Sequence, residues 1–218
     1  MKKYLVLLLV IGGVFLSGCH GWGITGIRGN GKVISDKREI ANFTGIELNG
    51  AYSVYIEVGK SVNLTIKGEE NILKYIRTKV EGNKLVIDTK KNISPRKEIQ
   101  ITITVPELEF LESSGACGVT VSNIASEKFL VDLSGAGSLD LSGKTGKLEI
   151  DLSGAGSLQA KDLKARKVVI SLSGASSADV YASETLDASV SGVGSITYYG
   201  DPKDVKKDVS GIGVIKKN

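Results

Sequence analysis

The stretch 131-VDLSGAGSLDLSGKTGKLEIDLSGAGSLQA-160 decides the fold, because it contains the same short segment twice. The centre of that segment is Ser-Gly followed by an apolar residue. It occurs six times, with serines spaced 20, 19, 20, 18 and 19 residues apart. A fixed period of this length is typical of stacked structural units. The six copies are Ser114-Gly115-Ala116, Ser134-Gly135-Ala136, Ser153-Gly154-Ala155, Ser173-Gly174-Ala175, Ser191-Gly192-Val193 and Ser210-Gly211-Ile212.

Apolar and polar residues alternate on the amino-terminal side of each serine, which is the period of a half-buried strand. A second alternating stretch follows each Ser-Gly pair, as in Leu139-Asp140-Leu141. Each unit should therefore hold two or three short strands joined by tight turns. A unit of about 19 residues is too short for a propeller blade but suits one coil of a parallel β-helix. We predict an all-β solenoid over residues 111–218, with coils about 4.8 Å apart.

The glycine of each repeated triplet is predicted to make a structural corner. Glycine adopts a left-handed backbone without steric cost, and a sharp corner needs such a conformation. The predicted corner residues are Gly115, Gly135, Gly154, Gly174, Gly192 and Gly211.

The preceding residues, 32–110, are expected to form strands and a helix that cap one end of the stack. Alternating stretches at 52–58, 62–66, 84–88 and 99–105 predict strands. Residues 69–76 have apolar side chains at helical spacing and acids in the first turn, which predicts one short helix. A weaker copy of the corner, Asn49-Gly50-Ala51, suggests that this half contributes related structure. Residues 32–218 are therefore expected to form a single domain.

The first 18 residues have the pattern of an export signal, with Lys2 and Lys3 before an apolar run over 4–15. The run ends in Leu16-Ser17-Gly18-Cys19, which resembles the lipobox of bacterial lipoproteins. That resemblance implies that Cys19 becomes the lipid-bearing N-terminus, so the membrane is a partner through this lipid. An ordinary signal peptide that ends at a cysteine is the alternative. The glycine-rich residues 19–31 are expected to form a flexible tether.

Composition excludes several classes of protein and of chemistry. With 41% hydrophobic and 24% charged residues, the chain is not intrinsically disordered. The net charge of +4, or +2 without Lys2 and Lys3, is too small and too dispersed to indicate nucleic acid as a partner. His20 is the only histidine and lies beside the lipid site, which excludes imidazole catalysis and histidine-bound metals in the folded domain. No cofactor and no metal is expected.

One constellation of side chains lies two residues before successive serines: Glu112, Asp132 and Asp151. On stacked coils, these carboxylates would lie about 5 Å apart and repel one another. We favour a solvated acidic stripe that neighbouring lysines relieve. A site for a cation or a glycan is one alternative, and a carboxylate pair for sugar cleavage is the other.

The lipobox, the strands, the single helix, the reiterated corners and the segment Tyr198-Tyr199-Gly200-Asp201-Pro202 together resemble one family over residues 33–217. It is the putative auto-transporter adhesin head domain family, or head GIN domain, of Gram-negative bacteria. The resemblance implies a right-handed β-helix-like fold and a cell-envelope location, and it supplies no catalytic residues. His20 after the cysteine resembles the sorting pattern for the outer membrane, where the domain would face the periplasm or the cell surface.

We therefore expect a lipid-anchored envelope protein, an adhesin that binds a glycan or another envelope protein without catalysing a reaction. Two alternatives stay open at this point. One is a structural or stress-associated envelope lipoprotein with no external ligand. The other is a polysaccharide lyase or hydrolase of β-helix fold.

Overall fold

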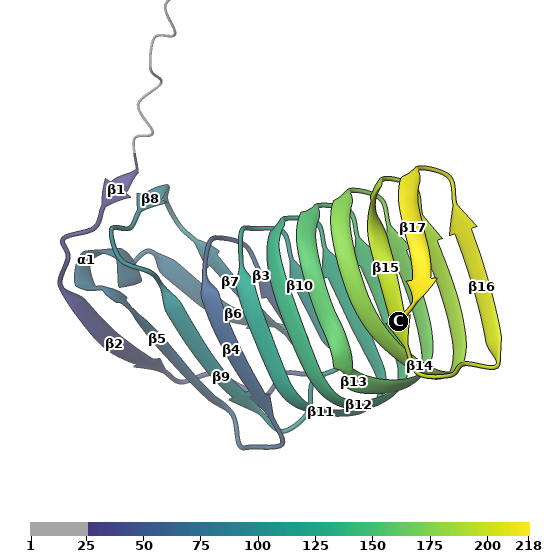
Figure 1. Cartoon of the computed structure of the whole chain (residues 1–218). Coiled ribbons are helices and arrows are strands. Elements are labelled where there is room, and N and C mark those ends of the chain that lie inside the picture. The colour runs from purple at the N-terminus through teal and green to yellow at the C-terminus, as the bar shows by residue number, and fades with distance from the viewer. Residues whose placement is uncertain (1–25) are drawn as a thin grey trace, which may run out of the picture.

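Successive copies of the repeat lie side by side as parallel strands in the computed structural model, which describes residues 26–218 (Figure 1). The leucine before each serine is in register with its counterpart, so that Leu133 pairs with Leu152, and Leu152 with Leu172. About 70% of the structure is strand, in about five turns with roughly 20-residue spacing. The predicted β-solenoid is confirmed. Residues 1–18, Cys19 and most of the predicted tether lie outside the described part of the chain.

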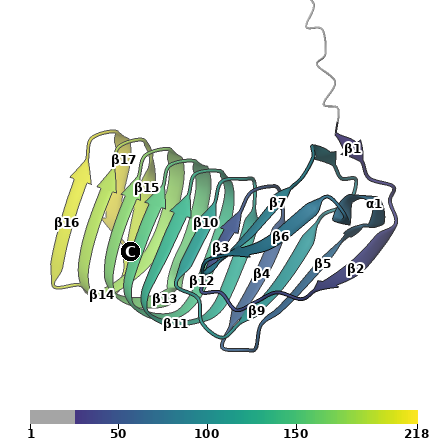
Figure 2. The ribbon, with the colours of Figure 1, turned by 180° about the vertical axis from the view of Figure 1, so that it is seen from behind.

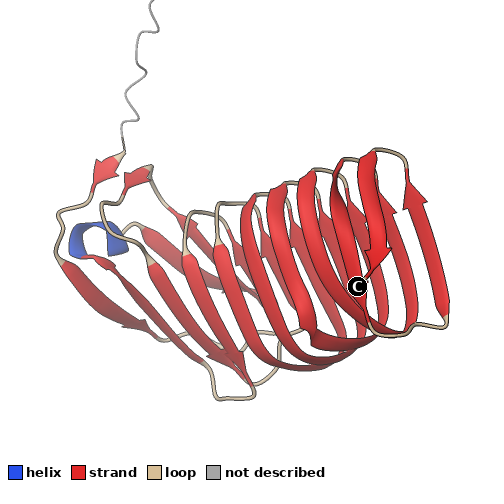
Figure 3. Cartoon of the chain, viewed as in Figure 1, coloured by secondary structure: helices blue, strands red, loops and turns tan. Residues whose placement is uncertain are grey.

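Each central coil is one long bent strand, in place of the two or three short strands that we predict from the sequence (Figure 3). The ladder follows the bend through small register shifts, for example between Val121 and Ile124. These strands are β11 (Gly118–Leu133), β12 (Ala136–Leu152), β13 (Ala155–Leu172) and β14 (Ala175–Val190). Shorter strands complete the carboxyl-terminal end: β15 (Val193–Tyr199), β16 (Asp204–Val209) and β17 (Ile212–Lys217).

The amino-terminal half contributes a coil of its own. Strand β3 (Gly45–Leu48) pairs with β10 (Phe110–Ser113), and β4 (Ser53–Val58) pairs with β11, all in parallel. The segment Asn49-Gly50-Ala51 between β3 and β4 is therefore the corner of that coil, and the amide of Ala116 donates to the Gly50 carbonyl at 2.7 Å.

The remaining elements cover the amino-terminal end of the stack, as Figure 2 shows from behind. The helix α1 (Glu70–Leu73) is a single turn, shorter than the predicted 69–76, because the chain then enters strand β6 (Ile76–Glu81), which pairs with β7 (Lys84–Thr89). No helix in the described residues is long and apolar enough to cross a membrane. The other strands are β1 (Ile27–Arg28), β2 (Val33–Arg38), β5 (Asn63–Glu69), β6 (Ile76–Glu81), β7 (Lys84–Thr89), β8 (Ile93–Ser94) and β9 (Gln100–Val105).

A continuous hydrophobic core runs through the coils, because inward-facing residues at equivalent positions stack in columns. The column five residues before the serines is almost entirely hidden from solvent. Its members in β11 to β14 are Phe129, Leu148, Val168 and Leu186. In β16 the equivalent Val205 is 37% exposed, so the last coil is covered on one side only.

The corner glycines are required for a reason other than the one that we predict from the sequence. None of the six has a φ in the left-handed region. Instead, a Cβ at any of them would come within 3.0 Å of backbone atoms of the preceding corner; at Gly154 it would overlap the carbonyl oxygen of Gly135. The left-handed residues of these coils include Asn123 (φ 62°) and Gly143 (φ 132°), at the register shift between β11 and β12. Close approach of neighbouring coils therefore imposes glycine at the corners.

Replacing Gly154 by alanine tests this steric explanation. We expect Gly154→Ala to lower the free energy of unfolding by about 1–3 kcal/mol, the usual cost of forcing extra atoms into a packed site. Gly118→Ala is the control, because its Cβ would meet only the Ser138 Oγ, at 3.7 Å. It should change stability by less than about 0.5 kcal/mol or stabilise the strand slightly. Chemical denaturation of both variants measures the difference, and equal effects would contradict the explanation.

Candidate functional site

The predicted acidic residues lie side by side on the outer face of the coils. Glu112 is in register with Asp132, and Asp132 with Asp151. Glu47 of β3 extends the same column on the amino-terminal side. Burial, together with the charges of Asp151 and Glu112, raises the pKa of Asp132 above its usual value. The column is therefore a row of carboxylates that repel one another.

A lysine relieves this repulsion at one end of the column. Lys84 lies between two of the acids, forming an ion pair with Glu47 and one of 3.3 Å with Glu112. The hydrogen bond from Lys84, with a second from Asn49, lowers the pKa of Glu47, and the same carboxylate raises the pKa of Lys84. Within residues 26–218, no group of three acidic, cysteine or histidine side chains is placed to hold a metal ion. The favoured interpretation, a solvated stripe that a lysine relieves, stays a prediction.

A shallow apolar depression of about 360 Å³ adjoins the acidic column. Phe110, Leu130 and Val169 line it together with Asp132 and Asp151. Phe110 is therefore an aromatic ring beside the carboxylates, which was not predicted from the sequence. Glu149 also lines this depression. It lies opposite Leu130 in the ladder and forms an ion pair with Lys128 at 2.8 Å.

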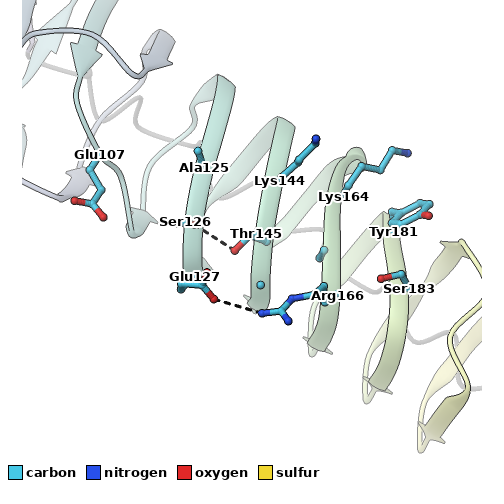
Figure 4. A pocket seen from close by; sticks show the side chains of 12 residues that line it. Glu107, Ala125, Ser126, Glu127, Lys144, Thr145, Lys164, Arg166, Tyr181 and Ser183 are labelled. Atoms are coloured by element: carbon cyan, nitrogen blue, oxygen red, sulfur yellow. Dashed lines mark hydrogen bonds and ion pairs between the residues drawn. The ribbon is translucent and has the colours of Figure 1, made fainter.

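A second and larger concavity, of about 820 Å³, lies on a different face of the coils (Figure 4). We call it the basic trough. It is built by the segments 125–127, 144–146, 164–166 and 181–183, which are neighbours in the solenoid. Its principal lining residues are Ser126, Thr145, Lys144, Lys164, Arg166 and Tyr181.

The positions along each strand alternate between the floor and the rim of this trough. Thr145 and Ala165 are buried in the floor, and the Thr145 hydroxyl lies 3.2 Å from that of Ser126. Lys144 and Lys164 are exposed and directly opposite each other in the ladder. Gly146 also lines the trough, where a Cβ would come within 2.6 Å of the Glu127 carbonyl oxygen and 3.0 Å of the Arg166 guanidinium.

Cations outnumber anions along the trough. Arg166 forms an ion pair of 3.4 Å with Glu127, whose side chain is 94% exposed, so the pair is weak. The ammonium of Lys164 lies 4.1 Å from the centre of the Tyr181 ring, a cation–π geometry that orders both side chains. Glu107 lies at the amino-terminal end of the trough (Figure 4).

This concavity was not predicted from the sequence, although Lys144 and Lys164 are separated by 20 residues, one coil length. Each lysine lies nine residues before a corner serine, Ser153 or Ser173, and the ladder has no register shift between the lysines and those serines. The repeats were compared only over the five residues before each serine, so the equivalence of the two lysines was missed.

Neutralising the acidic column should stabilise the protein slightly. We expect Asp132→Asn with Asp151→Asn to raise the free energy of unfolding at pH 7 by a few tenths of a kcal/mol, since like charges directly opposite each other are unfavourable. The pKa of Asp132 is higher in the folded chain than in the unfolded chain, so its ionisation costs stability as the pH rises through the folded pKa. The gain in stability should vanish near pH 3, below the ordinary aspartate pKa of about 3.9, because Asp132 is then protonated in both the folded and the unfolded chain.

Urea unfolding at the two pH values measures this difference, with Asp140→Asn and Asp179→Asn as the control. Those acids share a column but are separated by Gln159, so removing them should bring no such gain. Thermal unfolding with calcium and with chelator tests the alternative. A calcium-dependent rise in the melting temperature of the parent that disappears in the double variant would establish a cation site instead.

Comparison with known proteins assigns the family. The model of the family described as "Putative auto-transporter adhesin, head GIN domain" matches residues 42–202. The crystal structure of a putative adhesin from Bacteroides fragilis is 26% identical, with a TM-score of 0.74 over 88% of this chain and 100% of that chain. A search of curated protein sequences gives no match.

Two further solved structures, both from Parabacteroides distasonis, share the fold. One is a putative adhesin, 18% identical, covering 88% of this chain and 99% of the other, with a TM-score of 0.56. The second is a putative lipid binding protein, 23% identical, with the same coverages and a TM-score of 0.52. Because the family model spans well over half of the chain and the solenoid is shared, this protein belongs to the head GIN domain family of putative auto-transporter adhesins.

Proposed function

We propose that this protein is a non-catalytic adhesin of the cell envelope, held to the membrane by lipid on Cys19. The membership of the adhesin family supports a binding role. The lipobox-like segment 16–19 supports the anchor. Residues 26–218 contain no histidine, so that part of the chain has no Ser-His or Cys-His pair with which to activate a nucleophile.

The attachment of the first described residues is the observation that carries this proposal. The amide of Ile27 donates to the Asn92 carbonyl at 2.9 Å, and the amide of Gly29 donates to the Ser94 carbonyl at 3.0 Å. The chain that follows Cys19 thus joins the domain at the capped, amino-terminal end of the stack (Figure 1). A lipid at Cys19 would hold that end near the membrane and leave the lateral faces of the coils free to bind.

A buried carboxylate strengthens this junction. Glu69 is completely hidden from solvent and accepts hydrogen bonds from the amides of Gly31 (2.5 Å), Arg96 (2.7 Å) and Lys97 (3.2 Å). Burial opposes ionisation of this group, but the three donors together hold the pKa of Glu69 below its usual value. The ionised side chain therefore ties Gly31 to the loop after β8.

The substitution Cys19→Ala tests the anchor. We expect the variant to leave the membrane fraction, because removal of the acyl chains removes the apolar area that binds the bilayer. Cys117→Ala is the matched control: Cys117 is buried in the domain and should not affect fractionation. Recovery of Cys19→Ala in membranes after a carbonate wash would contradict lipid anchorage.

Protease added to intact cells tests the adhesin role in the same strains. An adhesin must be reachable from outside, so the parent should be digested without permeabilising the outer membrane. Digestion only after permeabilisation would favour the structural envelope lipoprotein instead.

A further inference from the structure

The basic trough contains two lysine charges that no carboxylate of the described residues neutralises. Lys144 and Lys164 are directly opposite each other in a parallel ladder, where strands are about 4.8 Å apart and like charges are destabilising. Neither ammonium is paired with a carboxylate among the described residues. The nearby pair Lys128 and Lys147, also opposite each other, shares Glu149. Lys144 and Lys164 thus lack a carboxylate partner such as Glu149 provides for Lys128 and Lys147.

The other lining groups fit a carbohydrate. Tyr181 is half-buried at the carboxyl-terminal end of the trough, held under the ammonium of Lys164 (Figure 4). Ser126 and Ser183 line the same concavity, whereas the Thr145 hydroxyl is buried against Ser126 and the Lys147 carbonyl. An aromatic ring beside hydroxyls and cations offers an apolar surface for a sugar ring and hydrogen-bonding groups for its substituents.

The distribution of charge favours a polymer with widely spaced anionic groups. Glu107 and Glu127 line the trough as well, so the positive potential is confined to the stretch around Lys144, Lys164 and Arg166. Duplex DNA carries a charge about every 1.7 Å along its axis, and its binding needs a broad basic surface. A sugar polymer with one carboxylate per ring matches a short basic stretch better.

We infer that the basic trough binds a carboxylate-bearing polysaccharide, with a sugar ring against Tyr181 and carboxylates held by Lys144, Lys164 and Arg166. This inference rests on the proposed binding role and names its ligand class. A carboxylate and an arginine or lysine form charge-assisted hydrogen bonds, which are about twice as strong as neutral ones. The coils extend the surface in steps of one strand, so a chain-like ligand can lie across several of them.

Titration calorimetry with polygalacturonate tests the inference on the full-length protein solubilised in detergent. We expect binding that weakens with salt and weakens about tenfold or more when the carboxylates are methyl-esterified, because the same sugar chain then lacks its charge. Lys144→Gln with Lys164→Gln should reduce the affinity by about tenfold or more. The control Lys37→Gln with Lys67→Gln removes the same charge from exposed positions on the cap and should change it less than about twofold.

Tyr181→Leu separates a sugar site from general attraction of anions. It should weaken binding of polygalacturonate while leaving any binding of poly-L-glutamate, a sugar-free carboxylate polymer, unchanged. No binding of polygalacturonate, equal losses in the two lysine variants, or tighter binding of duplex DNA would overturn the inference. Because the measurement in detergent does not need the anchor, its failure is distinct from a failure of the Cys19→Ala experiment.

Discussion

The close approach of successive coils at the Ser-Gly corners is the constraint on which the rest of the structure depends. At each corner an amide donates to the glycine carbonyl of the coil before it, as from Ala155 to Gly135 at 3.1 Å. The space beside that carbonyl is too small for a Cβ. The backbone ladder therefore passes through the corner without interruption, and equivalent residues stay in register on both sides of it.

Because the register is fixed, residues that are one sequence period apart form columns on the surface. Residues that are one coil apart become neighbours, so a chain of small net charge carries strongly acidic and strongly basic rows on different faces. Glu112, Asp132 and Asp151 form one such row, and Lys144 with Lys164 forms another. Both rows carry an electrostatic cost that only neighbouring charges or a ligand can offset. The acidic row has Lys84 at one end, whereas the pair in the trough has no such partner in the described residues.

Much of the fold could be predicted from the sequence because the corner period is explicit. The stacked columns, the register of the acidic residues and the related corner at Asn49-Gly50-Ala51 all follow from it. The continuous strands could not be predicted, because Asn123 and Gly143 at the bend are typical turn residues, yet the strand pairing resumes directly after them. The steric role of Gly154 could not be predicted either, because glycine is found both in left-handed turns and where another backbone approaches closely. The trough was missed because the repeats were compared only over the five residues before each serine, whereas Lys144 and Lys164 lie nine residues before theirs.

Amide hydrogen exchange at the corners tests the unbroken ladder most directly. The amides of Ala136, Ala155 and Ala175 donate to glycine carbonyls of the preceding coil at 3.0–3.1 Å. The account predicts that they are protected as strongly as the amides of the buried strand segments 129–133 and 148–152, because one cooperative ladder contains them all. Exchange at the rate of an open turn, with protection confined to the strands on either side, would contradict it.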